Sequence, residues 1–159
     1  MFIKKINKNK KGFTLVELLI VVAILGILAA VGIVSFGGFL GSAKVKATQA
    51  NHKNIVNFMN AKITQCSLQE RIDLVNENGD ARSPECKDLG ENDFVSHFRG
   101  SGFKNPYGST DSGNAVNNSS SCGDVLGRTD ITKNGDEYYQ ITTYYEDGVA
   151  CLSARITIE

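Results

Sequence analysis

Glu17 is the residue whose type and position most strongly suggest chemistry. It is the only ionisable side chain between residues 13 and 41, in an otherwise largely apolar stretch. An acidic side chain at the centre of a lipid-embedded helix costs about 2.5–3.5 kcal/mol, so such a group is usually paired or functional. Because the same stretch has no lysine, arginine or histidine, a counter-charge must come from another chain, from solvent at the membrane edge, or from a new positive group.

Cleavage between Gly12 and Phe13 would create such a positive group. It would leave a charged α-amine on Phe13, four residues before Glu17. The Glu17 carboxylate of a neighbouring copy would then pair with this amine as apolar helices stack, and the matched charges would set the axial register. The alternative is a Glu17 side chain that reaches the lipid interface or is protonated.

The four cysteines are candidates for disulfides rather than for a metal or redox centre. No CxxC pair occurs among them, which argues against a zinc ribbon or a thioredoxin-type site. Three connectivities are open. We favour Cys66–Cys86 with Cys122–Cys151, because each pair closes a short local loop, as small exported domains do.

Other polar groups are weaker candidates. Four residues near the C-terminal strands could offer oxygen ligands to calcium: Asp130, Asn134, Asp136 and Glu137. They lack the EF-hand spacing, so a solvated turn is the favoured interpretation. His52 and His97 are expected to be structural or solvated. No catalytic signature or phosphate-binding loop occurs, so we predict no enzyme activity, no cofactor and no metal site.

The N-terminal quarter of the chain has the arrangement of a membrane anchor. Residues 1–12 contain five lysines and no acid, and residues 13–41 exceed the roughly 20 apolar residues that span a bilayer as a helix. The positive-inside bias places the lysines in the cytoplasm. The alternative is a secretory signal that is removed. It ranks second, because the apolar run is longer than in such signals and no A-x-A cleavage site follows it.

The same helix is expected to continue to about residue 66. Apolar residues recur there at three- and four-residue steps, which predicts one apolar face on a helix roughly 80 Å long in total. Gly37 and Gly41 have the GxxxG spacing that permits close helix packing, while Gly32 and Gly38 add backbone freedom. Ordinary transmembrane glycines remain an equally good interpretation.

The C-terminal part is expected to be β structure. Residues 138–145 and 149–159 predict two strands around a turn at Gly148, with a weaker strand at 125–131. One face of the last strand should pack on the helix through Ala150, Leu152, Ala154, Ile156 and Ile158. A short helix at 91–98, capped by Asn92 or Asp93, and a surface loop at 99–123 complete the prediction.

These elements predict an α+β fold, with one long N-terminal helix packed on a small antiparallel sheet. The total charge is balanced, with 17 basic and 17 acidic residues. Residues 42–159, however, contain 12 basic and 16 acidic residues. We therefore expect no specific nucleic-acid site, since this part would repel phosphates.

The segment KKGFTLVELLIVVAILGILAAVGIVSF, residues 10–36, resembles the leader and N-terminal helix of type IV pilins. The shared pattern is a short basic leader, Gly, Phe, Thr-Leu-Val-Glu-Leu and a long apolar run. It matches Gly12, Phe13 and Glu17 together. The rest of the chain resembles the family only in architecture and in its C-terminal cysteine pair.

The resemblance implies a role for each matched residue. Gly12 would precede the bond cut by a prepilin peptidase, and Phe13 would become the N-methylated terminus. Glu17 would assist methylation and pair with a neighbouring amine during assembly. Cys122 and Cys151 would close the C-terminal loop of the pilin fold.

The resemblance also implies an organisation and a set of partners. Residues 1–12 would be a cleaved leader, 13–41 a transmembrane and assembly helix, and 42–159 a pilin headgroup outside the cytoplasm. Partners would be further copies, the prepilin peptidase and the inner-membrane pilus assembly machinery. The precursor would lie in the inner membrane and the mature chain in an extracellular filament for adhesion, motility or DNA uptake.

One position departs from the family pattern. Many type IVa pilins have a proline in this helix where the chain has Val34, so a kink here would depend on Gly32, Gly37 and Gly38. The alternatives are a major pseudopilin of type II secretion, which a well-formed calcium site would favour, and a membrane-tethered binding domain.

Overall fold

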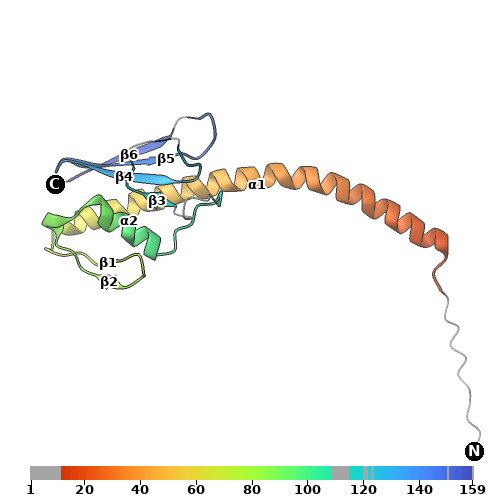
Figure 1. Ribbon diagram of the computed structural model, residues 1–159, viewed down its shortest axis with the longest axis horizontal. Helices are drawn as coiled ribbons and strands as arrows, with labels where there is room; N and C mark the ends of the chain where they lie inside the picture. The colour runs from red at the N-terminus through yellow and green to blue at the C-terminus, as the bar shows by residue number, and fades with distance from the viewer. Residues whose placement is uncertain (1–11, 109–114, 120–121, 123, 150, 159) are drawn as a thin grey trace, which may run out of the picture. The chain divides into compact units, whose positions relative to one another are not determined.

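The computed structural model describes residues 12–108, 115–119, 122, 124–149 and 151–158 (Figure 1). The chain divides into two units, Met1–Leu40 and Gly41–Glu159, the second of which is called the globular unit below. A single helix, α1, runs through the division from Leu15 to Cys66. The long continuous helix expected from the sequence is therefore confirmed, and it begins two residues later than expected.

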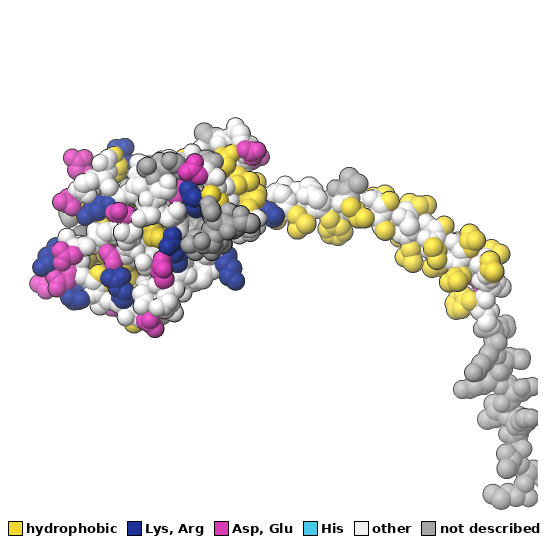
Figure 2. Space-filling view, viewed as in Figure 1, with side chains coloured by type: hydrophobic (Ala, Val, Ile, Leu, Met, Phe, Trp, Pro, Cys, Tyr) yellow, Lys and Arg dark blue, Asp and Glu magenta, His cyan; other side chains and the backbone are white. Residues whose placement is uncertain are grey.

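The first half of α1 is apolar on every side, and its large hydrophobic side chains are exposed among the described residues. Phe13 is 89% exposed and Ile33 is 75% exposed. In Figure 2 hydrophobic side chains follow this half of the helix. Among the described residues, α1 is the one helix long and apolar enough to cross a membrane. A helix that is hydrophobic all round requires a lipid or protein environment.

The second half of α1 is apolar on one face only. Ile55, Met59 and Ile63 lie four residues apart and are buried, which is the spacing of one helix face. Thr48 is also fully buried, and its hydroxyl donates a 3.0 Å hydrogen bond to the Lys44 carbonyl. The polar group is thereby satisfied inside the helix. This face forms one wall of the core.

A four-stranded sheet in the order β3-β4-β5-β6 forms the second wall. The last three strands are antiparallel, as predicted, whereas β3 runs parallel to β4, so the sheet is mixed. Gly135 (φ 57°) and Gly148 (φ 72°) provide the left-handed conformations in the two hairpin turns. The strands are β3 Val116–Asn117, β4 Thr129–Asn134, β5 Tyr138–Thr143 and β6 Leu152–Thr157.

The expected inward face of the last strand is confirmed for Ala154, Ile156 and Ile158, whereas Leu152 is half-buried and lies outside the core. Ile156 is buried in the same core as the α1 face, and Ala154 and Ile158 pack against that core. The intervening Ser153 and Arg155 are exposed, which is the two-residue alternation of a half-buried strand. Ala150 lies outside the described residues.

The expectation of a surface loop at 99–123 is wrong for its buried part. Ala115 and Val116 are buried, and Val116 pairs with Thr129 at the edge of β4. The Gly/Ser/Asn-rich composition predicted exposure. Two apolar residues are nevertheless enough to bury part of this segment where the edge of a strand is open to pairing. Residues 109–114 lie outside the described part. The weak strand at 125–131 is observed as β4, shifted toward the C-terminus.

Helix α2, Glu91–Gly100, joins the sheet to α1. Phe94 meets the Tyr139 ring edge-on at 5.4 Å, and Phe98 meets Phe58 of α1 at 5.3 Å. The predicted cap at Asn92 or Asp93 is wrong. The N-cap is Gly90, whose N–H donates to the Asp93 carboxylate at 3.0 Å, so Asp93 acts from the third helical position.

A small hairpin and one helical turn complete the globular unit. Strands β1, Leu74–Val75, and β2, Ala81–Arg82, pair antiparallel, and β1 lies against α2. A short 3₁₀ turn, Cys86–Asp88, follows the hairpin. These pieces close the end of the core near the last residues of α1.

We expect Met59→Ala to lower the free energy of unfolding by about 2–5 kcal/mol, because it opens a cavity in a fully buried position. Near-ultraviolet circular dichroism during urea unfolding of the detergent-solubilised chain measures this. The exposed neighbour provides a control, since Asn60→Ala should change the same quantity by less than about 0.5 kcal/mol. Equal losses in the two variants would show that this face of α1 does not form the core.

Candidate assembly site

Thr14 and Glu17 form a capping box at the start of α1. The Thr14 hydroxyl and the Thr14 N–H both donate to Glu17 Oε2, at 2.7 and 2.8 Å. The Glu17 N–H donates in return to Thr14 Oγ1 at 3.3 Å. Because α1 begins at Leu15, Thr14 occupies the N-cap and Glu17 the third helical position, which is the spacing of the S/T-x-x-E motif.

This arrangement gives Glu17 a neutral partner within its own chain, whereas from the sequence we considered only opposite charges. The T-L-V-E sequence contained the signal, since a Ser or Thr three residues before Glu ahead of an apolar run predicts this box. The box satisfies N–H groups that the start of a helix leaves unpaired. It does not neutralise the carboxylate, and no ion pair to Glu17 occurs within the described part of the chain.

Gly12 and Phe13 lie just before the cap, in backbone that is not helical. Phe13 is almost fully exposed, and a Cβ added to Gly12 would meet nothing within 4 Å. No other described residue therefore crowds the Gly12 side of the Gly12–Phe13 bond. Phe13 immediately precedes Thr14, so a terminal amine created at Phe13 would lie beside the capping box.

The helix glycines are not required by contacts within the chain. A Cβ added to Gly37, Gly38 or Gly41 would meet nothing within 4 Å, and one added to Gly32 would only touch the Phe36 ring at 4.0 Å. Their small size leaves open helix surface on which another helix could pack closely.

Both disulfides are present with the favoured connectivity. Cys66–Cys86 joins the end of α1 to the 3₁₀ turn, with the Cα atoms 5.5 Å apart. Cys122–Cys151 joins the segment before β4 to the start of β6, with the Cα atoms 6.3 Å apart. Each disulfide links a segment with little regular hydrogen bonding to the end of a helix or the start of a strand.

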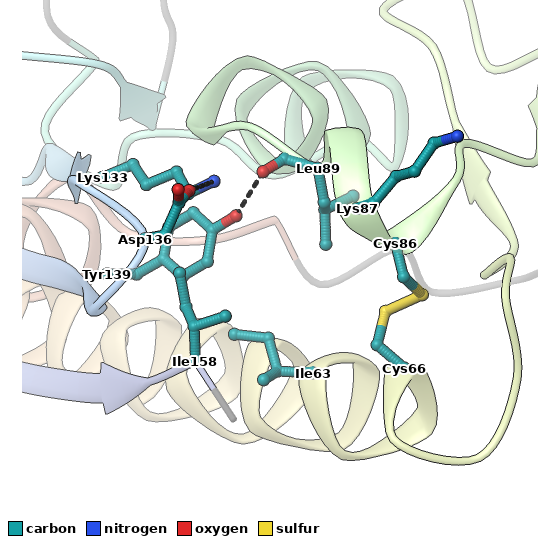
Figure 3. A pocket seen from close by; sticks show the side chains of 9 residues that line it. All are labelled: Ile63, Cys66, Cys86, Lys87, Leu89, Lys133, Asp136, Tyr139 and Ile158. Atoms are coloured by element: carbon teal, nitrogen blue, oxygen red, sulfur yellow. Dashed lines mark hydrogen bonds and ion pairs between the residues drawn. A yellow bond between two sulfur atoms is a disulfide. The ribbon is translucent and has the colours of Figure 1, made fainter.

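A cavity of about 390 Å³ lies beside the first disulfide (Figure 3). Its polar side chains already have partners in structural contacts. Lys133 Nζ lies 3.0 Å from Asp136 Oδ1, and the Tyr139 hydroxyl donates to the Leu89 carbonyl at 2.8 Å. Burial raises the pKa of Tyr139, so this hydroxyl stays protonated at neutral pH. These contacts indicate support of the fold rather than acid–base chemistry.

The residues considered as calcium ligands do not come together. Asp130 is buried, with Oδ1 2.9 Å from Arg128 Nε, whereas Asp136 pairs with Lys133. Asn134 lies four residues after Asp130 in the same strand, roughly 13 Å away. No group of three or more potential metal-ligating side chains occurs among the described residues.

The two histidines make structural contacts, one of the two roles considered for them. His52 Nδ1 lies 2.8 Å from Thr143 Oγ1, which links α1 to β5. His97 Nδ1 accepts the Val75 N–H at 3.0 Å, and its ring stacks on Phe58 at 4.4 Å. Burial lowers the pKa of both imidazoles, and nearby Lys62 lowers that of His97 further.

Comparison with known proteins finds a family model that matches the N-terminal segment and a relative that matches about half of the chain. Residues 7–33 match the prokaryotic N-terminal methylation motif. The type IV major pilin protein PilA of Myxococcus xanthus (strain DK1622) is 35% identical over 83 residues, which are 50% of this chain. The match covers 38% of that relative's length. No solved structure matches the chain.

The fold and the site define a class of proteins in which a methylation motif leads into a long apolar helix and an α+β globular unit follows. The chain is thus similar, at its N-terminal segment, to proteins with this methylation motif and, over about half of its length, to a type IV major pilin. This is the family that residues 10–36 resemble, and its members are structural proteins.

We expect the globular unit to lose stability as the pH falls below about 6.5, the ordinary pKa of histidine. The pKa of His52 and His97 is lower in the folded chain than in the unfolded chain. Their contribution to the free energy of unfolding is therefore complete above the unfolded-state pKa. It declines as the pH falls below that pKa, because the unfolded chain then binds more protons than the folded chain. Urea unfolding at pH 7.5 and pH 5.0 measures the decline.

The double variant His52→Asn/His97→Asn tests whether the imidazoles cause this decline. An asparagine side-chain oxygen can accept the Val75 N–H and face the Thr143 hydroxyl, but it does not titrate. The variant should therefore lose less stability than the parent between the two pH values. An unchanged pH dependence would assign the decline to carboxylates instead.

Proposed function

We propose that this chain is the precursor of a structural subunit of a type IV pilus-like filament. The observation that carries the proposal is the uncovered apolar half of α1, which begins with the Thr14–Glu17 capping box inside the methylation motif. Such a surface is stable in lipid before assembly and against other apolar helices afterwards. Burial contributes about 25 cal/mol per Å² of apolar area, repeated over every neighbour.

The proposed life of the subunit has three stages. In the precursor, residues 1–12 are a cytoplasmic leader, residues 13–41 span the inner membrane, and residues 42–159 lie outside the cytoplasm. A prepilin peptidase then cuts between Gly12 and Phe13, and Phe13 is N-methylated. Finally the assembly machinery extracts the subunit into an extracellular filament, which serves adhesion, motility or DNA uptake.

Glu17 has two successive roles in this proposal. In the precursor its carboxylate caps α1 through Thr14. After cleavage it also pairs with the positive Phe13 amine of a neighbouring copy, which sets the axial register of the stacked helices. A carboxylate oxygen and an amide oxygen can both accept the capping hydrogen bonds. Replacing Glu17 by glutamine therefore removes the charge and keeps the cap, which separates the two roles.

We expect Glu17→Ala to leave a membrane-resident chain that assembles few filaments, because both the cap and the charge are lost. Glu17→Gln should assemble equally poorly, although it retains an oxygen for the Thr14 cap. Electron microscopy and shearing yields measure assembly, and membrane fractionation measures residence. Wild-type filament yield from Glu17→Gln would contradict charge pairing while leaving the capping role intact.

We expect Gly12→Leu to block removal of the leader, since a bulky side chain would replace the open space beside the scissile bond. Intact-mass spectrometry of the chain from its native host should show an N-terminal methylated Phe13 for the parent. The variant should still begin at Met1. A variant that begins at Phe13 would contradict the requirement for glycine before the scissile bond.

A further inference from the structure

We propose that a groove at the helix-entry end of the globular unit binds the polar group of a zwitterionic aminophospholipid, the phosphoethanolamine group, while the precursor is in the membrane. The groove has a volume of about 490 Å³. Its apolar lining includes Val45 and Leu126, and Tyr107 is a third wall. Its charged lining is Lys46 on α1 with Glu146 and Asp147 on the β5–β6 turn.

The lining of the groove contains charges of both signs, as the binding of a zwitterion requires. Neither Lys46 nor Glu146 forms an ion pair within the described part of the chain. Asp147 accepts a 2.6 Å hydrogen bond from the Tyr144 hydroxyl, which holds its carboxylate in place. Lys46 is suited to a phosphate and the two carboxylates to a primary ammonium, because charge-assisted hydrogen bonds to such groups are strong.

The wall opposite the helix is held firmly. The Tyr107 hydroxyl donates to the Tyr145 carbonyl at 2.8 Å, and the Asn105 side-chain amide donates to the Leu126 carbonyl at 2.9 Å. Gly127 has φ 85°, and a Cβ there would collide with Asn105 Oδ1. The shape of the groove is thus fixed by hydrogen bonds rather than by mobile side chains.

The position of the groove along α1 selects a lipid as the occupant. Gly41 and Ser42 belong to its lining and directly follow the last apolar residue, Leu40. The helical part of the lining lies roughly 2–14 Å beyond Leu40 at 1.5 Å per residue, and the polar layer of a bilayer is roughly 5–8 Å thick on each side. Tyrosine is also enriched at this depth.

The charge pattern of the surrounding surface agrees with this assignment. Between Ser42 and Gln69 the chain contains four lysines and no acid, so phosphates meet a basic helix as soon as it leaves the apolar segment. Lys44 Nζ lies 5.5 Å from the centre of the Tyr107 ring, next to the groove. Figure 2 shows hydrophobic and acidic side chains side by side at this end of the globular unit.

The chemistry predicts a preference among lipids. Phosphatidylethanolamine supplies both a phosphate and an ammonium that donates hydrogen bonds. Phosphatidylcholine has a quaternary ammonium that cannot donate, and phosphatidylglycerol has no cation to meet Glu146 and Asp147. The inference rests on the proposed membrane-resident stage, so the experiment must test insertion and lipid preference separately.

The test uses the full chain in nanodiscs of phosphatidylcholine alone or mixed equally with phosphatidylethanolamine or with phosphatidylglycerol. Hydrogen–deuterium exchange is followed in peptides covering the β5–β6 turn. We expect exchange about fivefold slower with phosphatidylethanolamine than with either other lipid, which corresponds to the net contribution of one added hydrogen bond, about 1 kcal/mol. Equal exchange in all three lipids would overturn the inference.

Matched variants identify the groove as the cause. Glu146→Gln/Asp147→Asn and Lys46→Gln should each abolish the difference between lipids. The controls Glu70→Gln, at the far end of α1, and Lys53→Gln, on the same helix outside the groove, should preserve it. Protection that rises with the number of chains per disc, irrespective of lipid, would show that a second copy occupies the groove and would also overturn the inference.

Failure of the underlying membrane stage has a different signature. A chain that does not insert will be absent from nanodiscs of every composition, as size-exclusion chromatography would show. A chain that inserts normally but shows no lipid preference retains the proposed membrane stage and loses only the groove assignment.

Discussion

The uncovered apolar surface of α1 between Leu15 and Leu40 is the constraint on which the rest of this structure depends. Its side chains are exposed in the part of the chain that the structure describes, so it requires a lipid or protein environment rather than water. The second half of the same helix has the opposite requirement, because one face must build a core and the other must remain wet. A single unbroken helix thus couples a lipid-compatible segment to a water-soluble fold.

Glu17 illustrates how a polar group is tolerated in such a segment. Its position in the first turn lets it complete a capping box with Thr14, where N–H groups would otherwise lack acceptors. The cost of placing a carboxylate in an apolar helix is therefore partly offset before any partner arrives. Its remaining charge is what a filament neighbour would use, which connects the local geometry of one helix end to the proposed assembly.

The globular unit relies on polar contacts as well as on its core. His52 and His97 each use Nδ1 to join separate elements, and Tyr139 reaches across to the Leu89 carbonyl. Arg128, just before β4, and Asp130 in β4 form a buried ion pair. Groups that could look chemically active in a sequence are in this way committed to holding helices and strands together. Lys46 and Glu146 at the helix-entry groove differ from them, because neither forms an ion pair within the described chain.

Local pattern alone determined the long helix, the hairpin of β5 and β6 and the favoured disulfide connectivity, because periodicity, turn residues and short loop closure act between neighbours in the chain. It also singled out Glu17. The tertiary structure decided the parallel pairing of β3 and the partners of the histidines. These depend on segments far apart in sequence: Val116 becomes a strand only where the edge of β4 is open to it. The groove lined by Lys46 and Glu146 likewise exists only after folding brings together segments that are 100 positions apart in the sequence.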